Sequence, residues 1–133
     1  MTQSTVRTLE TTIERPLAEA YAFAHVPENF PRWASGLSTS LHKESDGWRA
    51  ETPVGEARVR FSEPNTLGVL DHWVDLPGQQ QIYIPLRMVA QGDETVVSLT
   101  LLRQPSMSDA DFERDAHHVE RDLAALKALL EAR

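Results

Sequence analysis

The stretch SDADFERDAHHVERDLAALKALLEA, residues 108–132, decides the fold because it encodes one long amphipathic helix. Ser108 can accept hydrogen bonds from the amides of the first turn, and Asp109 and Asp111 suit the positive end of the helix dipole. Such a helix needs a large apolar surface to cover its one apolar stripe. The residues of that stripe recur at spacings of four and three: Phe112, Ala116, Val119, Leu123, Leu126 and Leu130.

The chain before this helix is mostly strand-like. Alternating residues predict a strand at 6–15, a hairpin at 37–52 around Ser45-Asp46-Gly47, and a strand through Ala57, Val59 and Phe61. Further strands are predicted at 67–76, 80–90 and 95–103. The connections between the later strands are too short for parallel crossovers, so we expect a curved antiparallel sheet of about seven strands.

Two short helices are predicted after the first strand. Pro16 suits the start of a helix that ends near His25, because Val26 precedes Pro27 and is pushed toward extended geometry. A second helical piece is predicted at 28–35, with Gly36 as its cap. The whole pattern predicts an α+β fold, one domain over residues 1–133, with room for a small molecule between sheet and helix.

Composition excludes several classes of function. The formal net charge of −7 opposes nucleic acid, and no basic run overcomes it. The chain contains no cysteine, which excludes disulfides, thiolate nucleophiles and cysteine metal sites. No segment approaches the ~20 apolar residues of a membrane span, and the first residues do not resemble a leader, so we expect a cytoplasmic protein.

The order of strand, two helices, meander and long C-terminal helix resembles the helix-grip fold of the START-like, Bet v 1-like superfamily. The resemblance rests on Ile13-Glu14-Arg15-Pro16, on the stretch at 27–33, on Leu70-Asp71-His72-Trp73, on the stretch at 103–108 and on the ending at 119–127. The third and fourth of these resemble a bacterial branch of polyketide cyclases and dehydrases. The resemblance implies a ligand cavity between sheet and helix, but fold analogy supplies no reaction.

His72 is the candidate catalytic residue. In the strand at 67–76 the apolar phase is Leu70, Val74 and Leu76, which carries His72 inward. A neutral imidazole there could orient a ligand hydroxyl or act as a general base near pH 7. The alternative is a core histidine whose hydrogen bond is satisfied by a neighbour or by water.

Four further side chains are candidates for binding the ligand. Trp33 and Trp48 carry flat rings that could line the mouth of a cavity, and Phe61 shares the inward phase of its strand. Met88 could form an adaptable wall. Ordinary core packing explains each of these side chains as well. No cofactor is expected, because no glycine-rich phosphate loop opens a helix.

A metal site is not expected either. His117 and His118 are adjacent in the final helix and therefore diverge by about 100°, so they cannot close on one ion. His118 could share a face with Asp115 or Asp122, but two ligands make a weak site.

The outward phase of the sheet carries an aromatic pair, Trp73 and Tyr83, among charged residues. Such a pair could form a homodimer contact. Three hypotheses follow: a cyclase or dehydrase-like enzyme that acts on a small hydrophobic or aromatic molecule, a non-catalytic carrier of a lipid or another hydrophobic ligand, and a protein-interaction module similar to activators of the Hsp90 ATPase. A polar pair within hydrogen-bonding reach in the cavity favours the first, a dry apolar cavity the second, and a filled cavity with an exposed aromatic patch the third.

Overall fold

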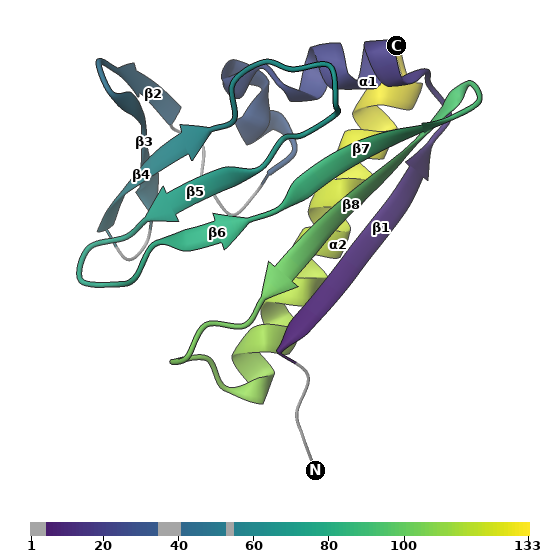
Figure 1. Cartoon of the computed structure of the whole chain (residues 1–133). Coiled ribbons are helices and arrows are strands. Elements are labelled where there is room, and N and C mark those ends of the chain that lie inside the picture. Colours follow the sequence, from purple (N-terminus) through teal and green to yellow (C-terminus); the bar gives the residue numbers. More distant parts are fainter. Residues whose placement is uncertain (1–4, 35–40, 53–54) are drawn as a thin grey trace.

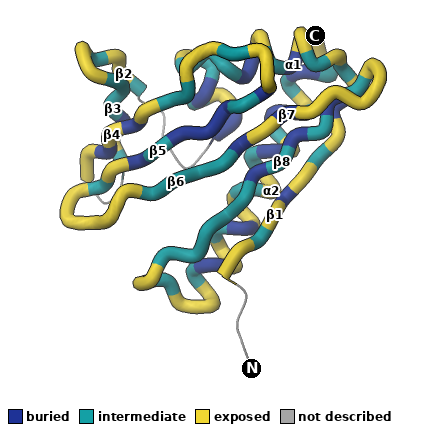
Figure 2. The backbone as a smooth tube through the Cα atoms, in the orientation of Figure 1, coloured by how far each residue is buried: buried dark blue, intermediate teal, exposed yellow. Residues whose placement is uncertain are grey.

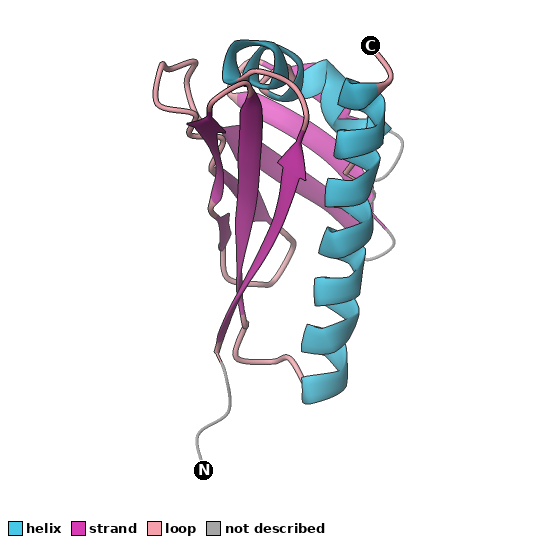
Figure 3. Cartoon of the chain, turned by 90° about the vertical axis from the view of Figure 1, so that its right-hand side faces the viewer, coloured by secondary structure: helices cyan, strands magenta, loops and turns pink. Residues whose placement is uncertain are grey.

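The C-terminal helix α2 (Asp109–Glu131) lies along one face of the antiparallel strands (Figures 1 and 3). The structure is a computed structural model that describes residues 5–34, 41–52 and 55–133. The remaining described elements are, in chain order, β1 (Val6–Ile13), α1 (Leu17–Ala24), the 3-10 helix η1 (Pro27–Arg32), β2 (Leu41–Glu44), β3 (Gly47–Thr52), β4 (Gly55–Phe61), β5 (His72–Asp75), β6 (Ile82–Ile84), β7 (Leu86–Gln91) and β8 (Glu94–Leu102).

Helix α2 begins at the predicted cap. The backbone N–H of Asp111 donates to Ser108 Oγ at 3.1 Å, and the N–H of Ser108 donates to the Asp111 carboxylate at 3.3 Å. This reciprocal pair satisfies two amides that an uncapped helix would leave unbonded. The predicted apolar stripe is buried except at Val119, which is only half-buried: Phe112, Ala116, Leu123, Leu126 and Leu130.

The strands form two antiparallel sheets, in the orders β1-β8-β7 and β2-β3-β4-β5-β6. The described chain has eight strands where about seven were expected, because the segment at 80–90 divides at Pro85. Proline has no amide hydrogen and cannot continue a ladder. β6 therefore pairs with β5, β7 pairs with β8, and the Pro85 carbonyl accepts from the N–H of Thr100 at 3.0 Å.

The strand predicted at 67–76 is also shorter than expected. Only β5 forms a ladder, while residues 68–70 bond to β7 through Leu70 N–H to Leu86 O and Met88 N–H to Gly68 O, each at 2.8 Å. Gly68 has φ +71°, and a Cβ there would collide with the Met88 carbonyl. Glycine at this position allows the chain to cross from one sheet to the other.

The second helical piece differs from the prediction in type and length. η1 is a 3-10 helix that ends at Arg32, because Pro31 lacks the amide that an α-helix would use there. Ser35, Gly36 and the first part of the predicted hairpin, 37–40, lie outside the described residues. The hairpin turn at Ser45-Asp46-Gly47 is confirmed by the pairing of β2 with β3.

The core lies between the inner faces of the sheets and the helices, and the exposed positions concentrate at the turns (Figure 2). Alternation along the strands predicts this face correctly: Leu9 and Ile13 in β1, and Ala57 and Val59 in β4, are buried. No helix among the described residues is long and apolar enough to cross a membrane.

Candidate functional site

A pocket of about 380 Å³ lies between the strands β5, β6 and β8, the helix η1 and the first half of α2. Its wall is mainly apolar: Phe30, Trp33, Ala34, Val74, Leu76, Ile82, Ile84, Leu86, Leu99, Leu101, Leu102, Met107, Val119 and Leu123. Polar side chains are fewer and include His72, Gln104, Asp115 and Asp122. The pocket is therefore an apolar space with polar groups at defined places.

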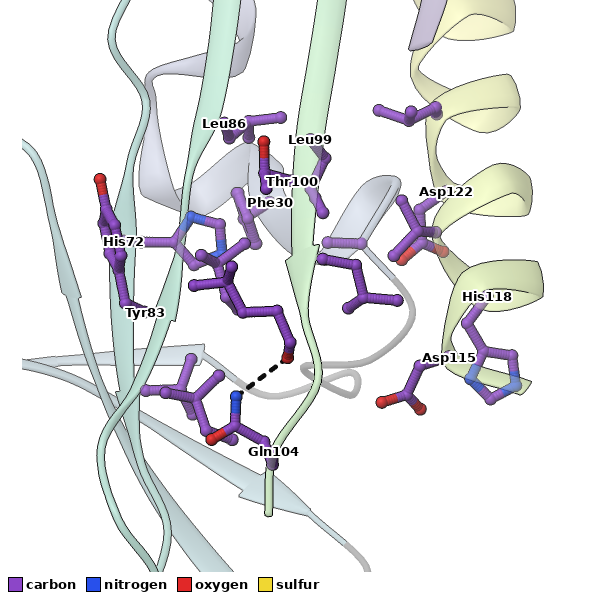
Figure 4. A pocket seen from close by; sticks show the side chains of 18 of the residues that line it. Phe30, His72, Tyr83, Leu86, Leu99, Thr100, Gln104, Asp115, His118 and Asp122 are labelled. Carbon is purple, nitrogen blue, oxygen red and sulfur yellow. Dashed lines mark hydrogen bonds between the residues drawn. The ribbon is translucent and has the colours of Figure 1, made fainter. Parts of the chain in front are cut away.

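His72 points into this pocket from β5 (Figure 4) and is only 3% exposed. The rings of Phe30 and Phe61 pack against it, with centroids at 5.1 and 5.8 Å. Burial disfavours the charged ring and lowers the pKa of His72 to about 4, although the Leu70 carbonyl and Asp71 act in the opposite sense. His72 is therefore neutral at pH 7.

The hydrogen bond of His72 determines which ring nitrogen carries the proton. Nδ1 lies 3.2 Å from the Leu70 carbonyl oxygen, and a carbonyl oxygen can only accept. A neutral imidazole in this position carries its hydrogen on Nδ1, so Nε2 is the hydrogen-bond acceptor. A ligand hydroxyl or amine is a suitable donor to Nε2.

Trp33 is the second predicted site residue that lines the pocket, and it is 4% exposed. Its indole Nε1–H is buried and has no hydrogen-bond partner among the described residues. A buried donor without an acceptor is unfavourable by roughly 1–3 kcal/mol.

The other three predicted ligand-binding residues are not among the residues that line this pocket. Phe61 lies next to His72 and Phe30. Trp48 packs on Phe61 with their ring centroids 6.3 Å apart. Met88 is 1% exposed and belongs to the core. Strand alternation assigns each side chain to the correct face, but the pocket occupies a different part of that face.

Helix α2 supplies polar residues that sequence reasoning did not assign to the site. Asp115, His118 and Asp122 line the pocket on the side opposite His72 (Figure 4). Val119, which belongs to the apolar stripe of α2, also lines the pocket. It is only half-buried because its side chain borders this open space. Partial burial raises the pKa of Asp115 above its ordinary value, and His118 acts in the opposite sense.

The sequence raises a metal site only as two ligands, His118 with Asp115 or Asp122. No group of three His, Asp or Glu side chains that could hold an ion occurs within the described ranges 5–34, 41–52 and 55–133. The spacing 115, 118, 122 already indicates a shared helix face in the sequence, since residues three and four apart are neighbours, but it does not show that this face borders a pocket.

Asp71 supports the strand that presents His72. It lies in the outward phase as expected, yet it is 4% exposed because Tyr83 and Arg87 cover it. Its carboxylate accepts from Tyr83 Oη at 2.5 Å, from Leu86 N–H at 2.9 Å and from two nitrogens of Arg87 at 2.9 and 3.2 Å. Although burial alone would raise it, the pKa of Asp71 is lowered by its hydrogen bonds from Arg87, Tyr83 and Leu86. Asp71 thus joins β5 to the chain on both sides of Pro85.

The predicted aromatic pair lies on the outer face. The rings of Trp73 and Tyr83 stack with centroids 5.4 Å apart, and the Arg60 guanidinium lies 4.7 Å from the Trp73 ring centre. The Tyr83 ring points away from the pocket (Figure 4). Tyr83 is nevertheless among the residues that line the pocket, so the pair borders the candidate site from the outer face.

Comparison with solved structures identifies the architecture. A START superfamily protein from Mycobacterium smegmatis superposes with a TM-score of 0.71 and 12% identity, over 96% of this chain and 97% of that one. Ara h 8.0201 superposes with a TM-score of 0.65 and 13% identity, over 96% of this chain and 99% of that one. This chain has the START-like helix-grip fold.

A protein from a biosynthetic locus is also similar in structure. DynU16, from the dynemicin biosynthetic locus, gives a TM-score of 0.73 and 11% identity, over 97% of this chain and 48% of that one. No family model and no curated protein matches the sequence. At these identities the similarity establishes the START-like fold.

Proposed function

We propose that this protein binds a small hydrophobic or aromatic molecule in the pocket between the sheet and α2. The observation that carries the proposal is the pocket itself, an apolar space of about 380 Å³. Ligand sites of proteins typically enclose roughly 300–1,000 Å³ and combine an apolar wall with a few polar groups. The START-like fold is suggestive of hydrophobic ligand binding, which supports the same function.

One polar side chain helps to define which apolar molecules fit best. His72 carries its hydrogen on Nδ1 and leaves Nε2 as an acceptor, while Phe30 offers an aromatic surface beside it. A hydroxyl group can both donate and accept. A hydroxylated aromatic molecule therefore matches this wall better than a hydrocarbon of the same size.

The properties of His72 favour a protein that binds its ligand without converting it. A general base is most effective when its pKa lies near the working pH, and a pKa of about 4 makes His72 a weak base at pH 7. In the second candidate function, a cyclase or dehydrase-like enzyme, the proton would be moved by Asp115, whose pKa is raised by burial. Loss of turnover in Asp115→Asn with ligand affinity retained would support this enzyme.

The proposed function is tested by filling the pocket. Val119→Trp places an indole in the pocket, and Val89→Trp makes the same change at a strand position that is 61% exposed. Calorimetry with 2-naphthol should show binding to the wild type and to Val89→Trp, and at least ~10-fold weaker binding to Val119→Trp. Equal affinities in both variants, or no binding of a broad set of apolar compounds by the wild type, would contradict the proposal.

The interaction hypothesis receives less support, since the cavity is open rather than filled. The stacked Trp73–Tyr83 pair on the outer face still supports a homodimer contact as a proposal. Sedimentation velocity of the wild type against Trp73→Ser checks it, because the substitution should shift a dimer toward monomer. The lack of cysteine supports a reducing, cytoplasmic location as part of the same proposal.

A further inference from the structure

The charged side chains of the pocket carry one sign. Among the described residues that line it, Asp115 and Asp122 are acidic, and none is Lys or Arg. The two internal segments outside the described ranges, 35–40 and 53–54, contain no Lys, Arg, Asp or Glu in the sequence. The sign of the charge at this pocket therefore does not depend on them.

The acidic residues occupy the more exposed side of the pocket. Asp115 and Asp122 are half-buried on α2, whereas Phe30, Trp33, His72 and Leu86 on the opposite walls are each less than 5% exposed. Figure 4 shows Asp115, His118 and Asp122 on the helix side and His72 facing them across the pocket. A ligand with its apolar part against the buried walls would place its other end close to these carboxylates.

This arrangement affects the binding of a ligand differently according to the charge of its polar group. A ligand carboxylate at the helix side would lie close to Asp115 and Asp122, which flank His118 on α2, and like charges close together in a partly dry site repel strongly. An amine would form charge-assisted hydrogen bonds with the same aspartates. A hydroxyl could donate to them without any charge.

On the basis of the proposed function, we infer that this pocket takes amphiphilic ligands whose polar end is an amine or a hydroxyl and rejects ligands that end in a carboxylate. Asp115 and Asp122 are the specificity-determining residues. Their partial burial strengthens the effect, because charges that are less solvated are less screened. The inference excludes free fatty acids and aromatic acids as the main ligands.

The test compares three compounds with the same aromatic part by calorimetry at pH 7.5: 2-naphthylmethylamine, 2-naphthylmethanol and 2-naphthoic acid. The wild type should bind the amine and the alcohol, and the acid at least ~10-fold more weakly than the alcohol. In Asp115→Asn/Asp122→Asn the difference in affinity between alcohol and acid should shrink by about 10-fold, and the amine should bind more weakly than it does to the wild type. Asp115→Asn alone should show the same change to a smaller extent.

A matched control removes two negative charges elsewhere on α2. Glu113→Gln/Glu120→Gln alters two exposed carboxylates that lie near Arg7, outside the pocket, and should leave the order of the three ligands unchanged. Equal binding of acid and alcohol by the wild type would overturn this inference and leave the proposed function standing. The same holds if Asp115→Asn and Asp115→Asn/Asp122→Asn both keep the wild-type preference for the alcohol over the acid. If none of the three compounds binds the wild type, the proposed function fails and the inference fails with it.

Discussion

An imidazole that burial keeps uncharged behaves as a hydrogen-bond acceptor rather than as a base. His72 shows this effect because Phe30 and Phe61 exclude water from the ring while the Leu70 carbonyl fixes the tautomer. The sequence predicts that His72 faces inward, since its strand neighbours Leu70 and Val74 are apolar. It cannot predict the low pKa, because that depends on two aromatic rings from distant parts of the chain.

The first prediction concerns the pH dependence of stability. The pKa of His72 is about 4 in the folded state, against 6.5 for a histidine exposed to water, so between these values the unfolded chain binds more protons. The contribution of His72 to the free energy of unfolding is therefore fully present above pH 6.5 and is lost as the pH falls toward 4. One pKa unit corresponds to about 1.4 kcal/mol, which makes the loss at pH 4 about 3 kcal/mol.

Urea denaturation of the wild type and His72→Phe at pH 7.5 and pH 4 measures this loss. The variant keeps an aromatic ring against Phe30 but cannot be protonated, so its free energy of unfolding should fall by about 3 kcal/mol less over the same interval. Parallel curves for the two proteins would show that His72 is not held neutral by burial.

At the scale of elements, helix α2 is both the main partner of the sheet and one wall of the pocket. Its cap and buried stripe follow from spacing alone, because Ser108, Phe112 and Leu126 obey local rules of helix geometry. Asp115 and Asp122 look like part of a solvated face in the sequence. They line the site because the pocket opens beside that part of the helix, which only the packed sheet reveals.

The second prediction compares two leucines of α2. Leu126 is fully buried away from the pocket, whereas Leu123 borders it. Leu126→Ala should lower the free energy of unfolding by about 2–5 kcal/mol, because it removes contacts and leaves a new cavity. Leu123→Ala should lower the free energy of unfolding by a smaller amount, because the Leu123 side chain already faces open space on one side. Chemical denaturation measures both, and an equal or larger loss for Leu123→Ala would contradict the position of the pocket.

At the scale of the whole molecule, the order of elements predicts the START-like architecture, and strand alternation predicts its inner face. The division at Pro85 and the crossing at Gly68 arise from backbone geometry that a periodicity count does not include. Trp48 and Met88 lie on the inner face but outside the pocket, because the position of a cavity along a sheet depends on how the whole helix packs across it. Alternation places Asp71 on the outer face, where Tyr83 and Arg87 from the neighbouring segment bury it.

The most direct test of the central claim is to locate a bound ligand by methyl NMR during a titration with 2-naphthol. The account predicts shifts that saturate together at Ile84, Val119 and Leu123, which line the pocket, and little change at the exposed Val89. Ring currents from a bound aromatic molecule would affect only methyl groups within a few ångströms of it. Shifts at Val89 or on the outer face, with Val119 and Leu123 unchanged, would contradict the claim that this space between sheet and helix is the ligand site.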